Sequence, residues 1–177
     1  MQPRVTHQPA ASVPRDENGR AGKYLTFHLD NDEFGIHVLK VREIMGLQEI
    51  TVVPQTPDFV RGVINLRGKI VPVLDLRLKF GLAEREYTER TCIIVVQTGG
   101  KGVPTMVGLI VEGVSDVLSL TGAEIESAPD FGQGVTIPYL LGVAKVNGKV
   151  TMLLDIDHVL GETAVLRELP GVVSEPS

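Results

Sequence analysis

The chain has 177 residues, enough for one ordinary domain or for two small units that share a core. Its net charge of −5 argues against nucleic acid as the main partner, because phosphate binding needs a basic surface. No run of 18 apolar residues is present, and the first 22 residues contain no apolar signal segment. We therefore expect a cytoplasmic protein that does not insert into a membrane.

The two ends of the chain differ in composition from the middle. Residues 1–22 are polar and aperiodic, which predicts a disordered tail, and residues 162–177 are expected to hold a helix end and a second tail. Between them Val and Ile dominate, and Gly and Pro separate short apolar runs. This pattern favours many strands joined by tight turns over a helical bundle.

The first expected elements are a strand at 23–29, a turn at 30–33 and a second strand at 34–38. The stretch VLKVREIMG (38–46) then mixes apolar Val41 and Ile44 with charged Arg42 and Glu43. Such a mixture is typical of a surface that contacts a partner. Ordinary core positions for Val41 and Ile44 are the alternative.

Further strand pairs are expected at 60–76, 90–120 and 140–156. Two aspartates close such pairs. Asp75 precedes LRLKFG and Asp155 precedes IDHVLGETAVLREL, so each is expected to cap a short helix, contributing about 1 kcal/mol.

An internal repeat is the strongest structural signal. An offset of 80 aligns residues 62–81 with 142–161 without a gap, and an offset of 73 places residues 35–45 over 108–118. The repeat predicts two similar units, near 23–90 and 91–161. Each unit is too small to hide its apolar face alone. The expected fold class is therefore mainly β, with two small barrels packed on a shared hydrophobic core of Val, Ile and Leu rather than aromatic residues.

No catalytic pattern stands out. The serines have no GxSxG context, and Cys92 lies in an apolar run typical of a buried residue. A metal-dependent hydrolase using His28, Asp30, Asp157 and His158 is a distant alternative, because neither EF-hand nor HExxH spacing is present. We expect no catalytic residue, no metal and no cofactor, and hence a binding module.

The two similar hairpins differ at one turn position. VNGK (146–149) is a strong hairpin signal, because Asn-Gly tolerates the positive φ of a type I′ turn. LRGK (66–69) places Arg67 where the other turn has Asn147, although arginine is strained at positive φ. Either Arg67 is a solvated surface residue, or it projects its five-donor fork toward a partner. We favour a partner.

The stretch FGIHVLKVREIMG, followed by TPDFVRGVINLRGKIVPVLDLRLKFG and GLIVEGVSDVLSL, resembles the CheW family of chemotaxis coupling proteins. The resemblance covers about residues 23–161 and implies a pair of five-stranded SH3-like barrels. It implies a non-enzymatic adaptor that joins the tips of methyl-accepting chemotaxis receptors to the regulatory domain of the histidine kinase CheA, in arrays at the membrane. It also implies that Val41, Glu43 and Arg67 face receptor or kinase.

Two proteins that contain the same fold are less similar. CheA also carries a phosphotransfer helix bundle and an ATP-binding domain, and CheV carries a receiver domain, for which this sequence has no room. The closest alternative is the same adaptor fold in another receptor–kinase pathway, such as pilus or surface sensing.

Overall fold

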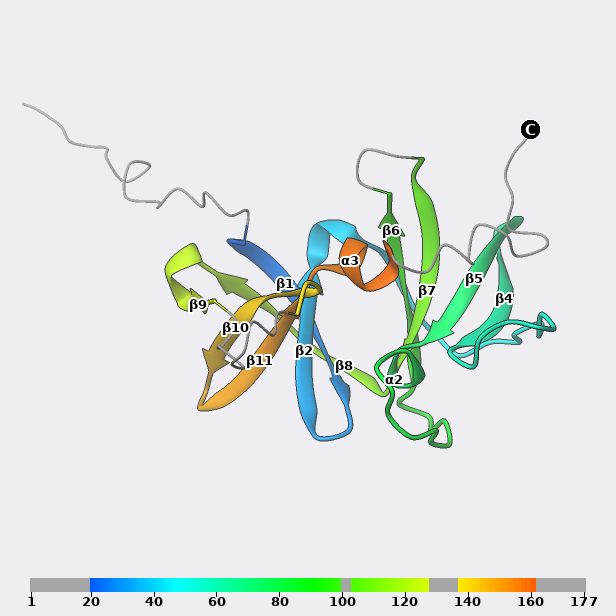
Figure 1. Cartoon of the computed structure of the whole chain (residues 1–177), viewed down its shortest axis with the longest axis horizontal. Coiled ribbons are helices and arrows are strands. Elements are labelled where there is room, and N and C mark those ends of the chain that lie inside the picture. Colours follow the sequence, from blue (N-terminus) through cyan, green and yellow to red (C-terminus); the bar gives the residue numbers. More distant parts are fainter. Residues whose placement is uncertain (1–19, 100–102, 128–136, 162–177) are drawn as a thin grey trace, which may run out of the picture.

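The computed structural model describes residues 20–99, 103–127 and 137–161. These residues form two β-sheets that lie side by side, with short helices near their junction (Figure 1). No helix within the described ranges is long and apolar enough to cross a membrane. The tails predicted at 1–22 and 162–177 lie outside the described residues, except that residues 20–22 lead into the first strand.

Sheet A has six strands in the order β8-β1-β2-β11-β10-β9. They are β1 (Gly22–Leu29), β2 (Asp32–His37), β8 (Gly113–Leu120), β9 (Ile125–Glu126), β10 (Leu140–Val146) and β11 (Lys149–Leu154). Sheet B has five strands in the order β3-β6-β7-β5-β4. They are β3 (Val41–Gly46), β4 (Val60–Leu66), β5 (Lys69–Asp75), β6 (Cys92–Thr98) and β7 (Thr105–Val111).

Within the described residues, four short helical segments connect or follow these strands. Helix α2 (Leu76–Lys79) follows β5, and α3 (Ile156–Gly161) follows β11. The 3-10 segments are η2 (Val38–Lys40), between β2 and β3, and η3 (Gly122–Glu124), before β9.

Each sheet curls into a barrel, because the chain beyond one edge strand meets the opposite edge. In sheet B, Thr51 lies after β3 and exchanges two backbone hydrogen bonds of 2.9 Å with Val63 of β4. In sheet A, β9 follows β8 and pairs with β10. Glycine permits the sheet B closure, since a Cβ on Gly62 would lie only 2.1 Å from the Thr51 carbonyl oxygen. The predicted pair of small barrels is confirmed, and we call them barrel A and barrel B.

The predicted repeat is present, but its halves do not correspond to the barrels. In the two strand orders, β8, β1, β2, β11 and β10 occupy the places of β3, β6, β7, β5 and β4. The first repeat thus supplies its opening hairpin to barrel A and its later strands to barrel B, and the second repeat does the reverse. The continuous units predicted at 23–90 and 91–161 are therefore wrong as a description of the barrels.

The exchange of hairpins takes place at two short connections. Only residues 38–40 separate β2 from β3, and only Glu112 separates β7 from β8. At both points the chain passes into the other barrel and does not pair with the strand it has just left. The parallel neighbours agree with the repeat: Leu153 lies opposite Gly35, and Val73 lies opposite Gly108.

One hydrophobic core joins the two barrels. Its buried members come from strands of both sheets and from α3, among them Leu25, Phe34, Leu74, Ile94, Leu109 and Ile156. The predicted predominance of Val, Ile and Leu is confirmed, but the expectation that aromatic residues are not part of the core is wrong. Phe27, Phe34, Phe80 and Tyr139 form a row with ring centroids 5.9, 5.8 and 5.4 Å apart. The row crosses from β1 and β2 to the end of α2 and to the residue before β10, where large rings span the junction.

Both predicted helix caps are confirmed. Asp75 Oδ1 accepts a hydrogen bond from the N–H of Arg77 at 2.9 Å. Asp155 Oδ1 accepts from the N–H groups of Asp157 and His158 at 3.1 and 3.3 Å. Asp75 does more than cap, because it is 1% exposed and its second oxygen accepts from the Tyr87 hydroxyl at 2.9 Å.

Candidate partner-binding surface

The three residues implied by the resemblance lie on barrel B. Val41 and Glu43 are on the edge strand β3, and Arg67 is in the turn between β4 and β5. β3 and β4 are at opposite edges of the sheet order, and closure of the barrel brings them together. Two of the three side chains, Glu43 and Arg67, are in direct contact.

Arg67 and Glu43 form an ion pair with two hydrogen bonds. Arg67 Nη1 donates to Glu43 Oε2 at 3.3 Å, and Nη2 makes a closer contact with Oε1. The arginine side chain is 72% exposed and the glutamate side chain 29%. The hydrogen bond from Arg67 lowers the pKa of Glu43, and the same bond raises the pKa of Arg67. Since a guanidinium has five N–H donors, the remaining donors of Arg67 are available to a partner.

The turn that carries Arg67 has the conformation predicted from its twin. Arg67 and Gly68 have φ of 51° and 89°, and Asn147 and Gly148 have φ of 52° and 77°. Arginine therefore occupies a left-handed position that favours Asn or Gly. Asn65 supports the turn by accepting from the N–H of Gly68 at 2.8 Å. The turn itself thus gives no reason for an arginine.

The two apolar residues of β3 differ in environment. Val41 is partly buried and packs against the shared core. Ile44 is 45% exposed, so the alternative that Ile44 is an ordinary core residue is wrong. The strand thus exposes Ile44 on the face opposite to Glu43, because successive side chains of a strand point to opposite faces.

The sequence analysis missed other exposed apolar residues. Val52 and Ile70 of barrel B are 75% and 41% exposed. Barrel A has exposed residues at places equivalent to Ile44 and Ile70, namely Val117 and Val150. The two offsets of the repeat could have indicated these matching positions, but exposure itself depends on barrel closure.

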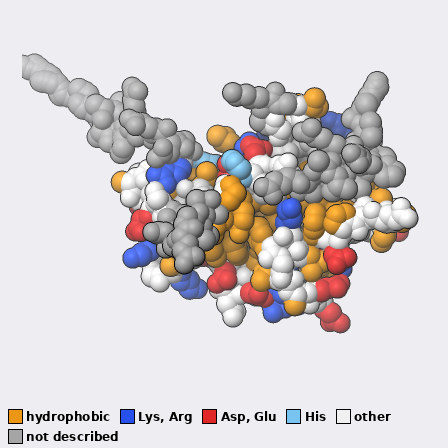
Figure 2. Space-filling model, in the orientation of Figure 1, with side chains coloured by type: hydrophobic (Ala, Val, Ile, Leu, Met, Phe, Trp, Pro, Cys, Tyr) orange, Lys and Arg blue, Asp and Glu red, His pale blue; other side chains and the backbone are white. Residues whose placement is uncertain are grey.

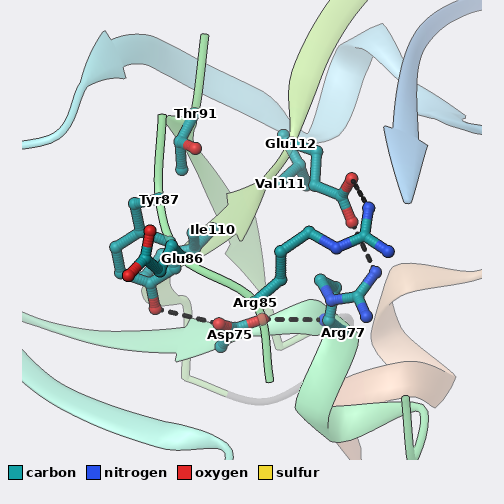
Figure 3. A pocket seen from close by; sticks show the side chains of 9 residues that line it. All are labelled: Asp75, Arg77, Arg85, Glu86, Tyr87, Thr91, Ile110, Val111 and Glu112. Carbon is teal, nitrogen blue, oxygen red and sulfur yellow. Dashed lines mark hydrogen bonds and ion pairs between the residues drawn. The ribbon is translucent and has the colours of Figure 1, made fainter. Parts of the chain in front are cut away.

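A hollow beside α2 offers no room for an organic ligand. Its nine lining residues include Asp75, Arg77 and Tyr87 (Figure 3), and its volume is about 10 Å³, on the order of one water molecule. Burial, together with the hydrogen bond to Asp75, raises the pKa of Tyr87 to about 12. A tyrosine held neutral in this way supports the buried carboxylate of Asp75.

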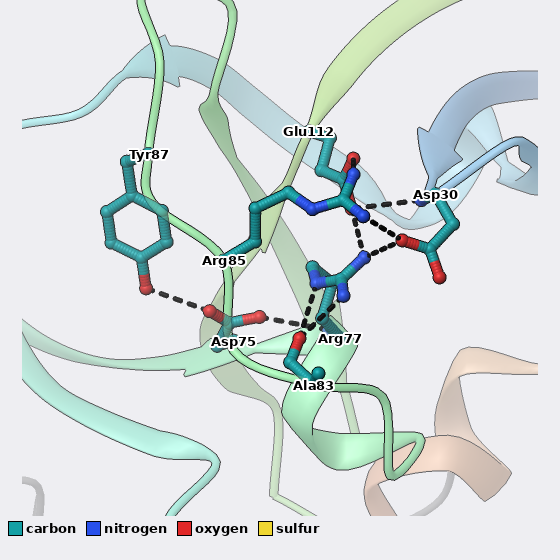
Figure 4. Close-up of polar contacts among 7 residues, drawn as sticks. All are labelled: Asp30, Asp75, Arg77, Ala83, Arg85, Tyr87 and Glu112. Atoms are coloured by element: carbon teal, nitrogen blue, oxygen red, sulfur yellow. Dashed lines mark hydrogen bonds and ion pairs between the residues drawn. The ribbon is translucent and has the colours of Figure 1, made fainter.

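The charged groups next to this hollow are already paired (Figure 4). The Arg77 side chain is 6% exposed and contacts Asp30, Glu112 Oε2 at 2.6 Å and the Ala83 carbonyl oxygen at 2.9 Å from Nε. Arg85 lies over the same carboxylates, with Nη2 3.0 Å from Asp30 Oδ1. This cluster joins the barrels rather than binding a ligand.

The structure does not bring the four residues of the hydrolase alternative together. His28 contacts Ser115, and Asp30 belongs to the cluster around Arg77. Asp157 pairs with Lys40 at 2.7 Å, and His158 pairs with Asp155. Over residues 20–99, 103–127 and 137–161, no group of three or more His, Cys, Asp or Glu residues could hold a metal ion.

Comparison with known proteins identifies the family. The CheW-like domain matches residues 23–164, most of the chain. This chain belongs to the CheW-like domain family. A similar relative is the chemotaxis protein CheW of Klebsiella aerogenes, 44% identical over 138 residues, which cover 78% of this chain and 81% of the relative. CheW of Bacillus subtilis is 33% identical over 148 residues, which cover 84% and 92%.

A solved CheW structure has the same architecture. The scaffolding protein TtCheW from Thermoanaerobacter tengcongensis aligns with a TM-score of 0.69 and 31% identity, covering 79% of this chain and 92% of that chain. The pair of SH3-like barrels implied by the resemblance is thereby confirmed.

Proposed function

We propose that this chain is a non-enzymatic adaptor that couples the tips of chemoreceptors to the histidine kinase CheA in the cytoplasm. Its membership of the CheW-like family and its likeness to a scaffolding protein support this role. The observation that carries the site is Arg67, an exposed arginine in a turn that favours asparagine, paired with Glu43 on the neighbouring edge strand. We assign Val41, Glu43 and Arg67 to contacts with receptor or with the regulatory domain of the kinase.

The surface supports such contacts through its chemistry. Figure 2 shows hydrophobic side chains in the middle of one face of the molecule, with charged side chains along its lower rim. On barrel B, exposed Ile44 lies on the same strand as Glu43, on its opposite face. Exposed apolar area contributes affinity, and a charged pair contributes a fixed orientation.

The mechanism of an adaptor is a difference in binding. A protein that holds receptor and kinase together changes kinase activity only if it contacts the active and inactive states with different affinity. The two barrels share one core, so contacts made on one barrel are mechanically coupled to contacts made on the other. This coupling suits a protein that must transmit position rather than perform chemistry.

Binding to a receptor cytoplasmic fragment and to the kinase regulatory domain, each measured separately by calorimetry, tests the site. Arg67→Asn should weaken binding to one of them about tenfold, as for an interface arginine. Its melting temperature should stay the same or rise slightly, because Asn-Gly suits the turn. Asn147→Arg, the reverse change in the equivalent turn of barrel A, is the matched control and should leave that binding unchanged.

A charge swap separates a contact with the partner from a purely internal role of the ion pair. In Glu43→Arg combined with Arg67→Glu, the internal pair is restored while the charges shown to a partner are exchanged. If Arg67 acts only by holding the turn to β3, the swap should restore binding. Continued weak binding by the swap supports direct contact, and unchanged binding by Arg67→Asn alone would contradict the site.

A further inference from the structure

The two barrels are joined by two clamps at equivalent positions of the repeat. Arg77 of α2 and Asp157 of α3 are related by the offset of 80. Arg77 contacts Asp30 in the β1–β2 turn and Glu112 in the β7–β8 connection. Asp157 contacts Gly99 after β6 and Lys40 in the β2–β3 connection. We call them the Arg77 clamp, formed by Asp30, Arg77, Arg85 and Glu112, and the Asp157 clamp, formed by Lys40, Gly99 and Asp157.

The Arg77 clamp has a buried centre and several bonds. The Arg77 side chain is 6% exposed and contacts one carbonyl oxygen and the carboxylates of Asp30 and Glu112, which are 32% and 24% exposed. Glu112 Oε2 also accepts from the backbone N–H of Asp30 at 2.9 Å. A cation with little solvent access is less screened than an exposed one, so salt weakens this clamp less than a surface ion pair.

The aromatic row strengthens the same end of the junction. Phe80 directly follows α2, which carries Arg77, and it stacks on Phe34 of β2 and on Tyr139. Aromatic pairs of this kind add attraction beyond the area they bury. Rotation of one barrel against the other at this end would therefore disrupt both the ion cluster and the row of rings.

The Asp157 clamp is smaller and more exposed. It consists of one ion pair, Lys40 Nζ to Asp157 Oδ2 at 2.7 Å, and one hydrogen bond from the Gly99 N–H at 3.3 Å. The two charged side chains are 34% and 35% exposed. Pairs with this exposure contribute little to stability and are weakened by salt.

The two clamps lie at opposite ends of the junction. In Figure 1, α2 and the β1–β2 turn are at the lower end of the junction between the barrels, and α3 and η2 are at the upper end. We propose that the barrels are joined by a one-sided hinge, with the Arg77 clamp as its fixed end and the Asp157 clamp as its releasable end. The motion is a small rotation, because the shared core remains packed between the barrels.

Each clamp contains a backbone N–H that reports whether it is closed. The N–H of Gly99 donates to Asp157, and the N–H of Asp30 donates to Glu112. Amide hydrogen exchange by NMR on the full chain measures the opening of each, because exchange follows the open population. Lys40→Ala should speed exchange at Gly99 by about two- to fivefold and leave Asp30 unchanged. High salt should produce the same pattern in the wild-type chain.

Arg42→Ala is the matched control. Arg42 is two residues from Lys40 and bonds Gln97 at 2.6 Å, outside both clamps, so Gly99 should keep its wild-type exchange rate in that variant. Equal effects of Lys40→Ala and Arg42→Ala on Gly99, or an equal change at Asp30, would overturn the proposal.

Spin-label distances distinguish hinge rotation from local opening of the β6–β7 loop. In a Cys92→Ala background, one label pair uses Lys23→Cys and Lys69→Cys, at the starts of β1 and β5. The other uses Asp32→Cys, at the start of β2, and Asp58→Cys, before β4. Lys40→Ala should broaden the first distance distribution and leave the second unchanged. If Gly99 exchanges faster while both distributions stay as in the parent, the loop opens alone and the hinge is refuted.

Discussion

The turns at Arg67 and Asn147 share a backbone but differ in what their side chains do. Their φ angles agree within 1° at the first position, 51° and 52°. Arg67 reaches Glu43, whereas the residue equivalent to Glu43, Asp116, accepts from the N–H of Val117 at 2.8 Å. The same turn conformation thus forms with either Arg or Asn at its first position, so folding of the turn does not require the arginine. Repeats within one chain provide this control without a second protein.

The two clamps are equivalent in position but differ in strength. Arg77 and Asp157 occupy equivalent places and have opposite charges. Arg77 pairs with two carboxylates and Asp157 pairs with one lysine, and these partners lie in connections between strands of the other barrel or between the barrels. The geometry of the junction is therefore shared by both repeats, while its strength is not. Burial makes the difference, since the Arg77 side chain is 6% exposed and the Asp157 side chain 35%.

The largest expected effect is a difference in stability between variants of the two clamps. Arg77→Met should lower the free energy of unfolding by about 2–3 kcal/mol, because Asp30 and Glu112 lose their buried cation and keep only the exposed Arg85. Asp157→Asn should lower it by less than about 1 kcal/mol. Urea unfolding measures both, and Arg77→Lys, which keeps the charge, should lie between them. Similar losses for Arg77→Met and Asp157→Asn would contradict the unequal clamps.

A smaller difference is expected between the two helix caps. Asp75→Ala should cost about 2–3 kcal/mol, more than a cap alone, because the Tyr87 hydroxyl also loses its acceptor in a buried site. Asp155→Ala should cost about 1 kcal/mol, since that side chain is 27% exposed. Thermal unfolding of both variants checks the order. Equal costs would mean that the contact with Tyr87 contributes little.

The smallest expected effect is a shift in the pKa of Glu43, which Arg67 contacts from its turn. The Glu43 carboxyl should titrate below its ordinary pKa of 4.5, because Arg67 stabilises the charged form. A lowered pKa means that the pair contributes stability above pH 4.5 and loses it as the pH falls through the folded-state pKa. NMR titration of the Glu43 side chain measures the midpoint. It should move back toward 4.5 in Arg67→Asn, and an unchanged midpoint would refute this account of the shift.

Local signals in the sequence predicted the local structure well. Alternation of apolar and polar residues located β1 and β2, the aspartates located the starts of α2 and α3, and Asn-Gly predicted the conformation of the turn at 147–148, which the equivalent turn at 67–68 shares. Each of these features depends only on residues that are close together in the sequence, so the sequence alone is enough to find it. The surface that we propose for a partner was predicted through Arg67, whose residue type conflicts with its turn.

Long-range features could not be read in the same way. The exchange of hairpins depends on which barrel the chain enters after residues 38–40, and the repeat is equally consistent with two separate units. The pairing of Arg67 with Glu43 requires barrel closure, and the Arg77 clamp collects residues from three distant segments. The aromatic row was missed because a low aromatic content says nothing about where the rings lie.

The exchanged hairpins also constrain how the protein is made. Barrel B is complete once β7 has been synthesised, but β1 and β2 must wait for β8 to β11 before their own barrel can close. During synthesis the first hairpin therefore has one neighbour missing on each side, with unpaired edges that invite wrong pairing. The last strand, β11, bonds to β2 across more than a hundred residues of chain and ends that exposure. Emergence of β11, rather than completion of the first repeat, is the event that allows barrel A to close.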